Sequence, residues 1–173
     1  MSSLHIADTG LFVAMGQPSN SRYQAVRRFA RRNDLTFMVP EQVYDELTTD
    51  QPAVENPPVD TAIEAGWVQI AAPLLFSEPI VSRVMDGVQR YIANADGRPA
   101  DEIERADAAL AALAAQQLSA GQPTAVYIYT TDIAAGEGAE TVLASEGYGD
   151  SVTFVNGFRF IDDLLADDLT DRR

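Results

Sequence analysis

The stretch AVYIYTTDIAAG, residues 125–136, decides the fold class of this chain. Its first six residues form a nearly continuous apolar run, which is typical of a strand covered on both faces in a parallel sheet. Two threonines and Asp132 end the run, and small residues that suit a helix follow. The segment therefore predicts a buried strand, a carboxylate at its end and a helix after it.

The rest of the chain repeats this alternation of short apolar segments and longer segments of helical period. Besides residues 125–130, strands are expected at 4–7, 36–39, 67–71 and 152–155. Helices are expected at 9–16, 20–32, 40–48, 58–65, 78–94, 101–119, 134–147 and 158–167. Residues 48–58, rich in proline and turn residues, are expected to form a loop. The βαβα order predicts an α/β fold with a short, mostly parallel sheet between helices.

The length of 173 residues fits one domain, and no repeat or linker divides the sequence. No run of about 18 apolar residues is present, so we expect no membrane span. The first residues lack the basic and apolar segments of a secretion signal, and the absence of cysteine excludes disulfides and thiolate metal sites. We therefore expect a soluble domain located in the cytoplasm.

The net charge of −14 comes from 26 acidic and 12 basic residues, and every basic residue is arginine. A very acidic surface without lysine suits high salt, where screening shortens the range of self-repulsion to a few Å. We interpret the acidity as the solvent adaptation of a halophile. The alternative, a charge directed at a basic partner, is weaker because the acidic residues are scattered along the chain.

Four acidic residues stand out by their positions. Ligands of open α/β sheets bind beyond the carboxyl ends of the strands, and Asp8 and Asp132 each follow an expected strand. Each is also a candidate N-cap, a residue that accepts backbone N–H bonds at the start of a helix. Glu46 flanks the apolar side of a short helix. Asp107 lies among alanines inside a helix, where a solvated polar position is the alternative interpretation.

In motif and order, these residues resemble the PIN-domain nucleases, a family that includes the toxin ribonucleases of toxin–antitoxin modules. IADTGLFVA resembles the first motif and carries Asp8, and VPEQVYDEL resembles the second and carries Glu46. RADAALAALA resembles the third, with Asp107, and YIYTTD the fourth, with Asp132. The closing SVTFVNGFRFIDDLL is similar to the last strand and helix of the family, so the resemblance covers residues 4–165.

The resemblance implies a three-layer PIN-like fold, with residues 1–173 as a single PIN-like domain. The stretch between Glu46 and Asp107 is longer than in small toxin members, which predicts an extended helical region at about residues 72–100. The family often has a further acidic residue soon after the fourth motif. Here Glu137 and Glu140 are the candidates for that position.

The resemblance also implies a metal-dependent ribonuclease whose catalytic residues are Asp8, Glu46, Asp107 and Asp132. Carboxylates that converge repel one another, and their pKa values rise unless a cation neutralises them. Oxygen ligands favour Mg²⁺ or Mn²⁺ over Zn²⁺. We expect the three aspartates to bind the metal, directly or through water, and Glu46 to bind the metal or orient the water. His5, inside a strand, is expected to be a packing residue.

RNA is the expected partner of such a site, with an antitoxin protein and a homodimer as further expectations from the resemblance. A run of arginines in the segment 22–32 places its members in pairs on shared helix faces. The run is either a phosphate-contact face or the solvated side of an amphipathic helix. The candidate nucleic-acid contacts are Arg27, Arg28, Arg31 and Arg32, with Thr9 and Thr131 as weaker candidates.

Other classes of enzyme lack their signatures in this sequence. A haloacid-type phosphatase needs a second Asp where Gly10 stands, and a receiver domain needs a lysine. Neither G-x-G-x-x-G after the first strand nor G-x-S-x-G is present. The serious alternative is a catalytically inactive PIN-like module that binds RNA or a protein.

Overall fold

The computed structural model describes residues 2–49, 56–121 and 123–171. Its centre is a five-stranded sheet in the order β3-β2-β1-β4-β5, with every pair of neighbours parallel. The strands are β1 (Ser3–Ala7), β2 (Phe37–Val39), β3 (Val68–Ile70), β4 (Ala125–Thr130) and β5 (Val152–Asn156). All five expected strands are confirmed, to within one residue at each end. Because they run in the same direction, their carboxyl ends share one edge of the sheet.

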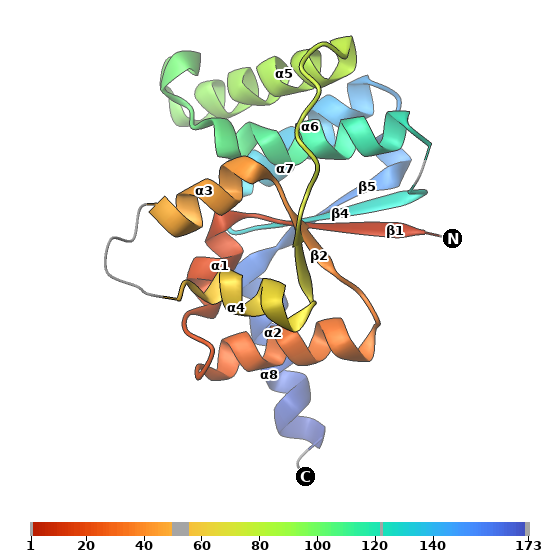
Figure 1. The fold of residues 1–173 in the computed structure, drawn as a ribbon. Coiled ribbons are helices and arrows are strands. Elements are labelled where there is room, and N and C mark those ends of the chain that lie inside the picture. Colours follow the sequence, from red (N-terminus) through yellow and green to blue (C-terminus); the bar gives the residue numbers. More distant parts are fainter. Residues whose placement is uncertain (1, 50–55, 122, 172–173) are drawn as a thin grey trace.

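Helices cover both faces of the sheet and give three layers (Figure 1). The upper layer in this view contains α5 (Pro79–Asp96), α6 (Arg105–Ser119) and α7 (Ile133–Ser145). The lower layer contains α1 (Thr9–Met15), α2 (Ser21–Arg32), α4 (Pro58–Ala65) and α8 (Gly157–Asp171). The remaining helix, α3 (Glu41–Thr49), contacts both α1 and α6. The predicted α/β, three-layer PIN-like arrangement is therefore confirmed.

Helix α6 explains how the upper layer lies against the sheet. Every residue from Ala108 to Ala115 is buried, and the small alanine side chains let the helix lie between the sheet and α5. The predicted start of this helix at residue 101 is wrong. A short 3-10 helix, η1 (Ala100–Glu102), comes first, and the side chain of Ile103 is buried before the α-helix begins at Arg105. Asp107 thus stands in the first turn of a helix whose body is core.

The connections agree in part with expectation. The predicted helical region 72–100 contains helix α5. Elsewhere, a second 3-10 helix, η2 (Gly149–Ser151), precedes β5. Helix α8 continues to Asp171, beyond its predicted end. Most of the predicted loop 48–58, residues 50–55, lies outside the described residues. Within the described segments, none of the helices combines the length and apolarity that crossing a membrane requires.

Candidate active site

Asp8 follows the central strand β1 and is almost fully buried, with 4% of its surface exposed. It caps α1, since its Oδ1 accepts a 2.7 Å hydrogen bond from the backbone N–H of Thr9. Its Oδ2 accepts a 2.6 Å hydrogen bond from the hydroxyl of Thr130. Burial raises the pKa of Asp8, while these two hydrogen bonds act in the opposite direction. The carboxylate is therefore held firmly in a place that disfavours its charge.

Asp132 occupies the equivalent place after β4. Its Oδ1 caps α7 by accepting a 3.1 Å hydrogen bond from the N–H of Ala135, and its own N–H donates to Thr130 Oγ1 at 3.1 Å. The N-cap interpretation is thus correct for both strand-terminal aspartates. An aspartate that caps a helix can still bind a metal ion or a substrate, because a carboxylate has about four lone-pair positions and the caps use few of them.

Glu46 reaches the same edge from α3. Its Oε2 accepts a 2.5 Å hydrogen bond from the hydroxyl of Thr9, the residue that follows Asp8. Burial raises the pKa of Glu46 to about 7, and interaction with Glu104 and the charge of Asp8 add to the increase. The Thr9 bond acts against that increase. Glu46 and Asp8 are thus linked through a single threonine.

Asp107 completes the predicted set from the first turn of α6. Burial raises the pKa of Asp107 to about 7, and nearby negative charges add to this. Those charges belong to Asp8, Asp132, Glu104 and Glu46. The four predicted acidic residues come from four separate parts of the sequence, and in the structure the charges of the other three act on Asp107. The solvated alternative for Asp107 does not hold.

Glu104 is a fifth acidic residue, which the sequence analysis missed. It stands at the N-cap position of α6, yet its side chain makes no capping hydrogen bond and instead interacts with Glu46. The predicted helix start at residue 101 hid this role, because it placed Glu104 within a helix. We call Asp8, Glu46, Glu104, Asp107 and Asp132 the carboxylate cluster.

Three other singled-out residues take different roles. His5 packs in β1, with its ring stacked on Tyr127 at 5.0 Å and its Nδ1 2.9 Å from the hydroxyl of Tyr129. Glu140 accepts a 3.3 Å hydrogen bond from the N–H of Phe154 on β5, and Glu137 is exposed on α7. The expectation that His5 is a packing residue agrees with these contacts.

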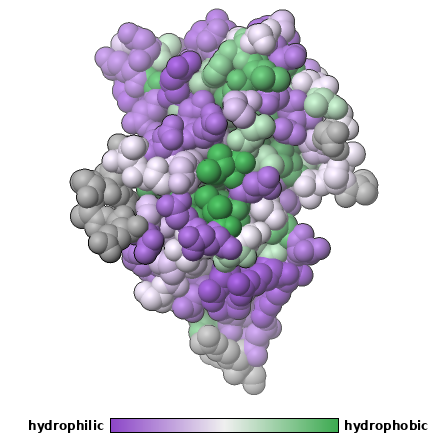
Figure 2. Space-filling model, in the orientation of Figure 1, coloured by the Kyte–Doolittle hydropathy of each residue, from purple (hydrophilic) through white to green (hydrophobic). Residues whose placement is uncertain are grey.

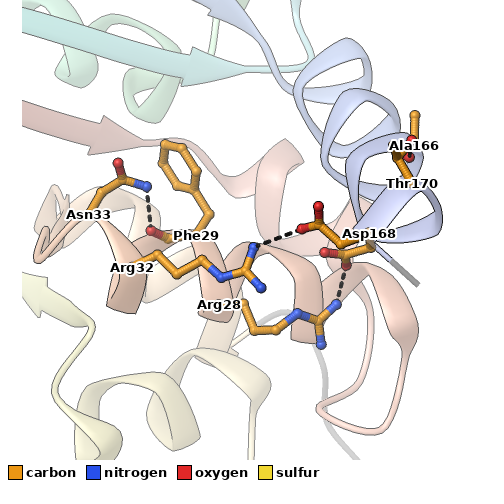
Figure 3. A network of polar contacts seen from close by, with 8 residues as sticks. Arg28, Phe29, Arg32, Asn33, Ala166, Asp168 and Thr170 are labelled. Carbon is orange, nitrogen blue, oxygen red and sulfur yellow. Dashed lines mark hydrogen bonds and ion pairs between the residues drawn. The ribbon is translucent and has the colours of Figure 1, made fainter. Parts of the chain in front are cut away.

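The arginines of α2 make contacts away from the carboxylate cluster. Arg28 pairs with Asp168 on α8, and Arg32 lies 3.7 Å from a carboxylate oxygen of Asp171 (Figure 3). Arg31 is exposed, and the buried Nε of Arg27 has no hydrogen-bond partner among the described residues. Just after α2, the chain enters β2, so the last turn of α2 lies at the amino edge of the sheet. The structure does not bring this face to the cluster.

Thr131, the other weak candidate, is enclosed beside the cluster. A Cβ added to Gly10 would lie 2.0 Å from its Oγ1, and one added to Gly157 would lie 3.0 Å from its Cγ2. Gly10 and Gly157 therefore leave the room that Thr131, one residue before Asp132, occupies. Thr9, its counterpart after β1, is held by its bond to Glu46.

The donor chemistry of the cluster fits a hard divalent cation, because carboxylate oxygens are the ligands that Mg²⁺ and Mn²⁺ prefer. Burial, with neighbouring negative charge, raises the pKa values of Asp107 and Glu46, and a bound cation would oppose both effects. Across residues 2–49, 56–121 and 123–171, however, no three His, Cys, Asp or Glu side chains stand close enough to hold a metal ion. Binding one therefore requires side-chain rotation in the cluster.

The three-layer parallel α/β fold, with acidic residues at the carboxyl edge of its sheet, is consistent with the class of PIN domains. The family model described as "Halobacterial PIN domain" matches residues 1–169, and the chain belongs to this family. A search of the curated proteins finds no match. PIN domains are generally nucleases that use divalent metal ions and typically bind RNA. The family also agrees with the halophilic interpretation of the acidic composition.

Proposed function

We propose that this protein is a metal-dependent endoribonuclease that hydrolyses RNA phosphodiester bonds at the carboxylate cluster. One observation carries the proposal: in a PIN domain, the hydroxyls of Thr9 and Thr130 hold Glu46 and Asp8 at the carboxyl edge of the sheet, and Thr130 also accepts the N–H of Asp132. Such concentrated negative charge opposes folding unless a cation offsets it. A role of these carboxylates in metal binding and catalysis explains why the protein keeps so much negative charge in one place.

The aspartates of the cluster, Asp8, Asp107 and Asp132, would hold Mg²⁺ or Mn²⁺. When bound, such an ion lowers the pKa of a coordinated water and stabilises charge on the phosphodiester. The chain itself fixes the geometry: Thr130 orients Asp8, and Thr9 orients Glu46. Thr130 lies in β4 and Thr9 two residues after β1, and sites built on strands and helices are more precise than sites on loops.

Glu46 orients the attacking water and accepts its proton in this proposal. Without a bound metal, burial raises the pKa of Glu46 to about 7, and a bound cation would lower it, so that Glu46 is a carboxylate able to accept a proton near neutral pH. Glu104, which interacts with the Glu46 side chain, helps to set that value. Glu104 is thus a positioning residue.

The test is RNA cleavage with Mn²⁺ at high KCl, followed on denaturing gels. Asp8→Asn and Asp132→Asn are expected to lose at least about 100-fold in rate, since changes near a metal site commonly cost that much. Glu64→Gln, an exposed change on α4, is the matched control and should cleave like wild type. Unchanged cleavage by both aspartate variants would reject the proposal.

The catalytically inactive module remains the alternative, and the presence of all four expected acidic residues argues against it. The role as the toxin of a toxin–antitoxin pair stays a prediction, tested by co-purification with the product of the neighbouring reading frame. The homodimer also stays a prediction, tested by the mass in solution.

A further inference from the structure

Arg105 is an unusual residue to begin α6. A cation in the first turn of a helix opposes the helix dipole, so its presence there costs stability. Its neighbour Glu104 belongs to the carboxylate cluster, yet within the described residues Arg105 forms no ion pair. Its guanidinium carbon lies instead 5.6 Å from the ring centre of Phe76. The charges that act on Asp8, Glu46 and Asp107 in the described part of the chain are all those of acidic residues, so the guanidinium of Arg105 faces Phe76 and stays unpaired one residue after Glu104.

Phe76 is equally unusual, because 45% of its surface is exposed although its segment is firmly anchored. The hydroxyl of Ser82 donates a 2.9 Å hydrogen bond to the carbonyl of Phe76. Gln116 on α6 holds the preceding residues, accepting from the N–H of Leu75 at 2.7 Å and donating to the carbonyl of Pro73 at 3.3 Å. The aromatic ring is therefore presented to solvent on a fixed backbone.

The surroundings of Phe76 extend this surface. Figure 2 shows hydrophobic residues over β3 and the segment that leads to α5, and Ile70, Leu75 and Phe76 are the exposed large hydrophobic residues of this part. Arg105, which follows Glu104 in the chain, adds a positive charge beside the Phe76 ring. An aromatic ring beside an unpaired guanidinium offers the two contacts that a single-stranded nucleic acid uses, base stacking and phosphate binding.

We infer that Arg105 and Phe76 form a contact site for the RNA strand beside the carboxylate cluster, with the guanidinium on a phosphate and the ring against a base. The inference rests on the proposed function and assigns the residues that hold the substrate. A chain of net charge −14 whose site is itself acidic repels a polyanion. Arg105, one residue after Glu104, supplies a positive charge that such a strand can contact.

The test measures RNA binding separately from cleavage. All variants are made in the Asp132→Asn background, and a fluorescein-labelled single-stranded RNA is titrated with Mn²⁺ present, over the range of KCl in which the circular dichroism spectrum is constant. The variants are Arg105→Gln, Arg105→Lys and Phe76→Leu. The matched control is Arg90→Gln, which removes the same charge from the exposed face of α5.

Arg105→Gln should weaken binding several-fold at the lowest salt and reduce the slope of log affinity against log salt by about 0.7, the value of one phosphate contact on a single strand. Arg105→Lys should keep the slope. Phe76→Leu should weaken binding about five-fold or more with the slope unchanged, because stacking releases no counterions. Arg90→Gln should match the parent.

Equal affinity and slope for Arg105→Gln and Arg90→Gln would overturn the inference, as would the absence of RNA binding by the parent. Either result leaves the cleavage comparison of wild type and Asp132→Asn intact. Conversely, loss of binding in Arg105→Gln together with no cleavage by wild type would support the contact site and reject the proposed nuclease.

Discussion

The hydroxyl of Thr130 donates a 2.6 Å hydrogen bond to Oδ2 of Asp8, across the ends of two adjacent central strands. The hydroxyl oxygen of Thr130 also accepts a hydrogen bond from the backbone N–H of Asp132 at 3.1 Å. Both Thr130 and Asp8 are buried, so water cannot replace this bond. One threonine thus positions two acidic residues that are far apart in the sequence.

Thr130→Val should destabilise the protein by about 1–3 kcal/mol, the cost of leaving a buried acceptor unpaired. The melting temperature should fall by several degrees, and differential scanning calorimetry measures it. Thr153→Val is the control, since Thr153 is exposed on the neighbouring strand β5 and should tolerate the change. Equal melting temperatures for the two variants would show that the Thr130–Asp8 bond contributes nothing.

Gly10→Ala should displace Thr131, because the new Cβ would lie 2.0 Å from Thr131 Oγ1 and 3.2 Å from its Cβ. Overpacking of this kind costs about 1–3 kcal/mol, and the shift should also slow RNA cleavage by moving the residue before Asp132. The double variant Gly10→Ala, Thr131→Ala removes the colliding oxygen and should recover most of the lost stability. Additive losses in the double variant would rule out this contact as the cause.

Without divalent ions, the stability should depend on pH through Asp107. Its pKa is about 7 in the folded protein, above the ordinary value of 3.8 for an aspartate, so its protonated form favours folding. That contribution is full below about pH 4 and is lost as the pH rises through 7. Asp107→Asn should therefore match wild type in acid and exceed it in urea unfolding above pH 7. Asp86→Asn, on the exposed side of α5, should not show this pH-dependent gain. A difference that is constant with pH would contradict the raised pKa.

Arg28→Gln tests the α2 face. Its ion pair with Asp168 is partly exposed, with 34% and 19% of the two side chains accessible, so its loss should cost at most about 1 kcal/mol. Because the partner on α8 already neutralises this arginine, RNA affinity should change less than in Arg105→Gln. If Arg28→Gln lost more RNA affinity than Arg105→Gln, the α2 face and not Arg105 would be the phosphate-contact surface.

The strands were predictable because they are short apolar runs buried on both faces, as β4 shows at residues 125–130. The acidic residues were also predictable, since Asp8 and Asp132 must meet at the edge that parallel strands share. Glu104 was not, because its role depends on where α6 begins, and the burial of Ile103 sets that start. The pairing of α2 with α8 was equally hidden, since it joins two distant helix surfaces.

The most direct measurement for the central claim is calorimetric titration of the metal-free protein with Mn²⁺ slightly above neutral pH, paired with thermal unfolding. Wild type should bind, and saturating Mn²⁺ should raise its melting temperature by about 5 °C or more, as expected for a ligand that binds only the folded state. Asp107→Asn should bind at least about ten-fold more weakly. A wild-type protein with no binding heat and an unchanged melting temperature at millimolar Mn²⁺ would contradict a metal site in the carboxylate cluster.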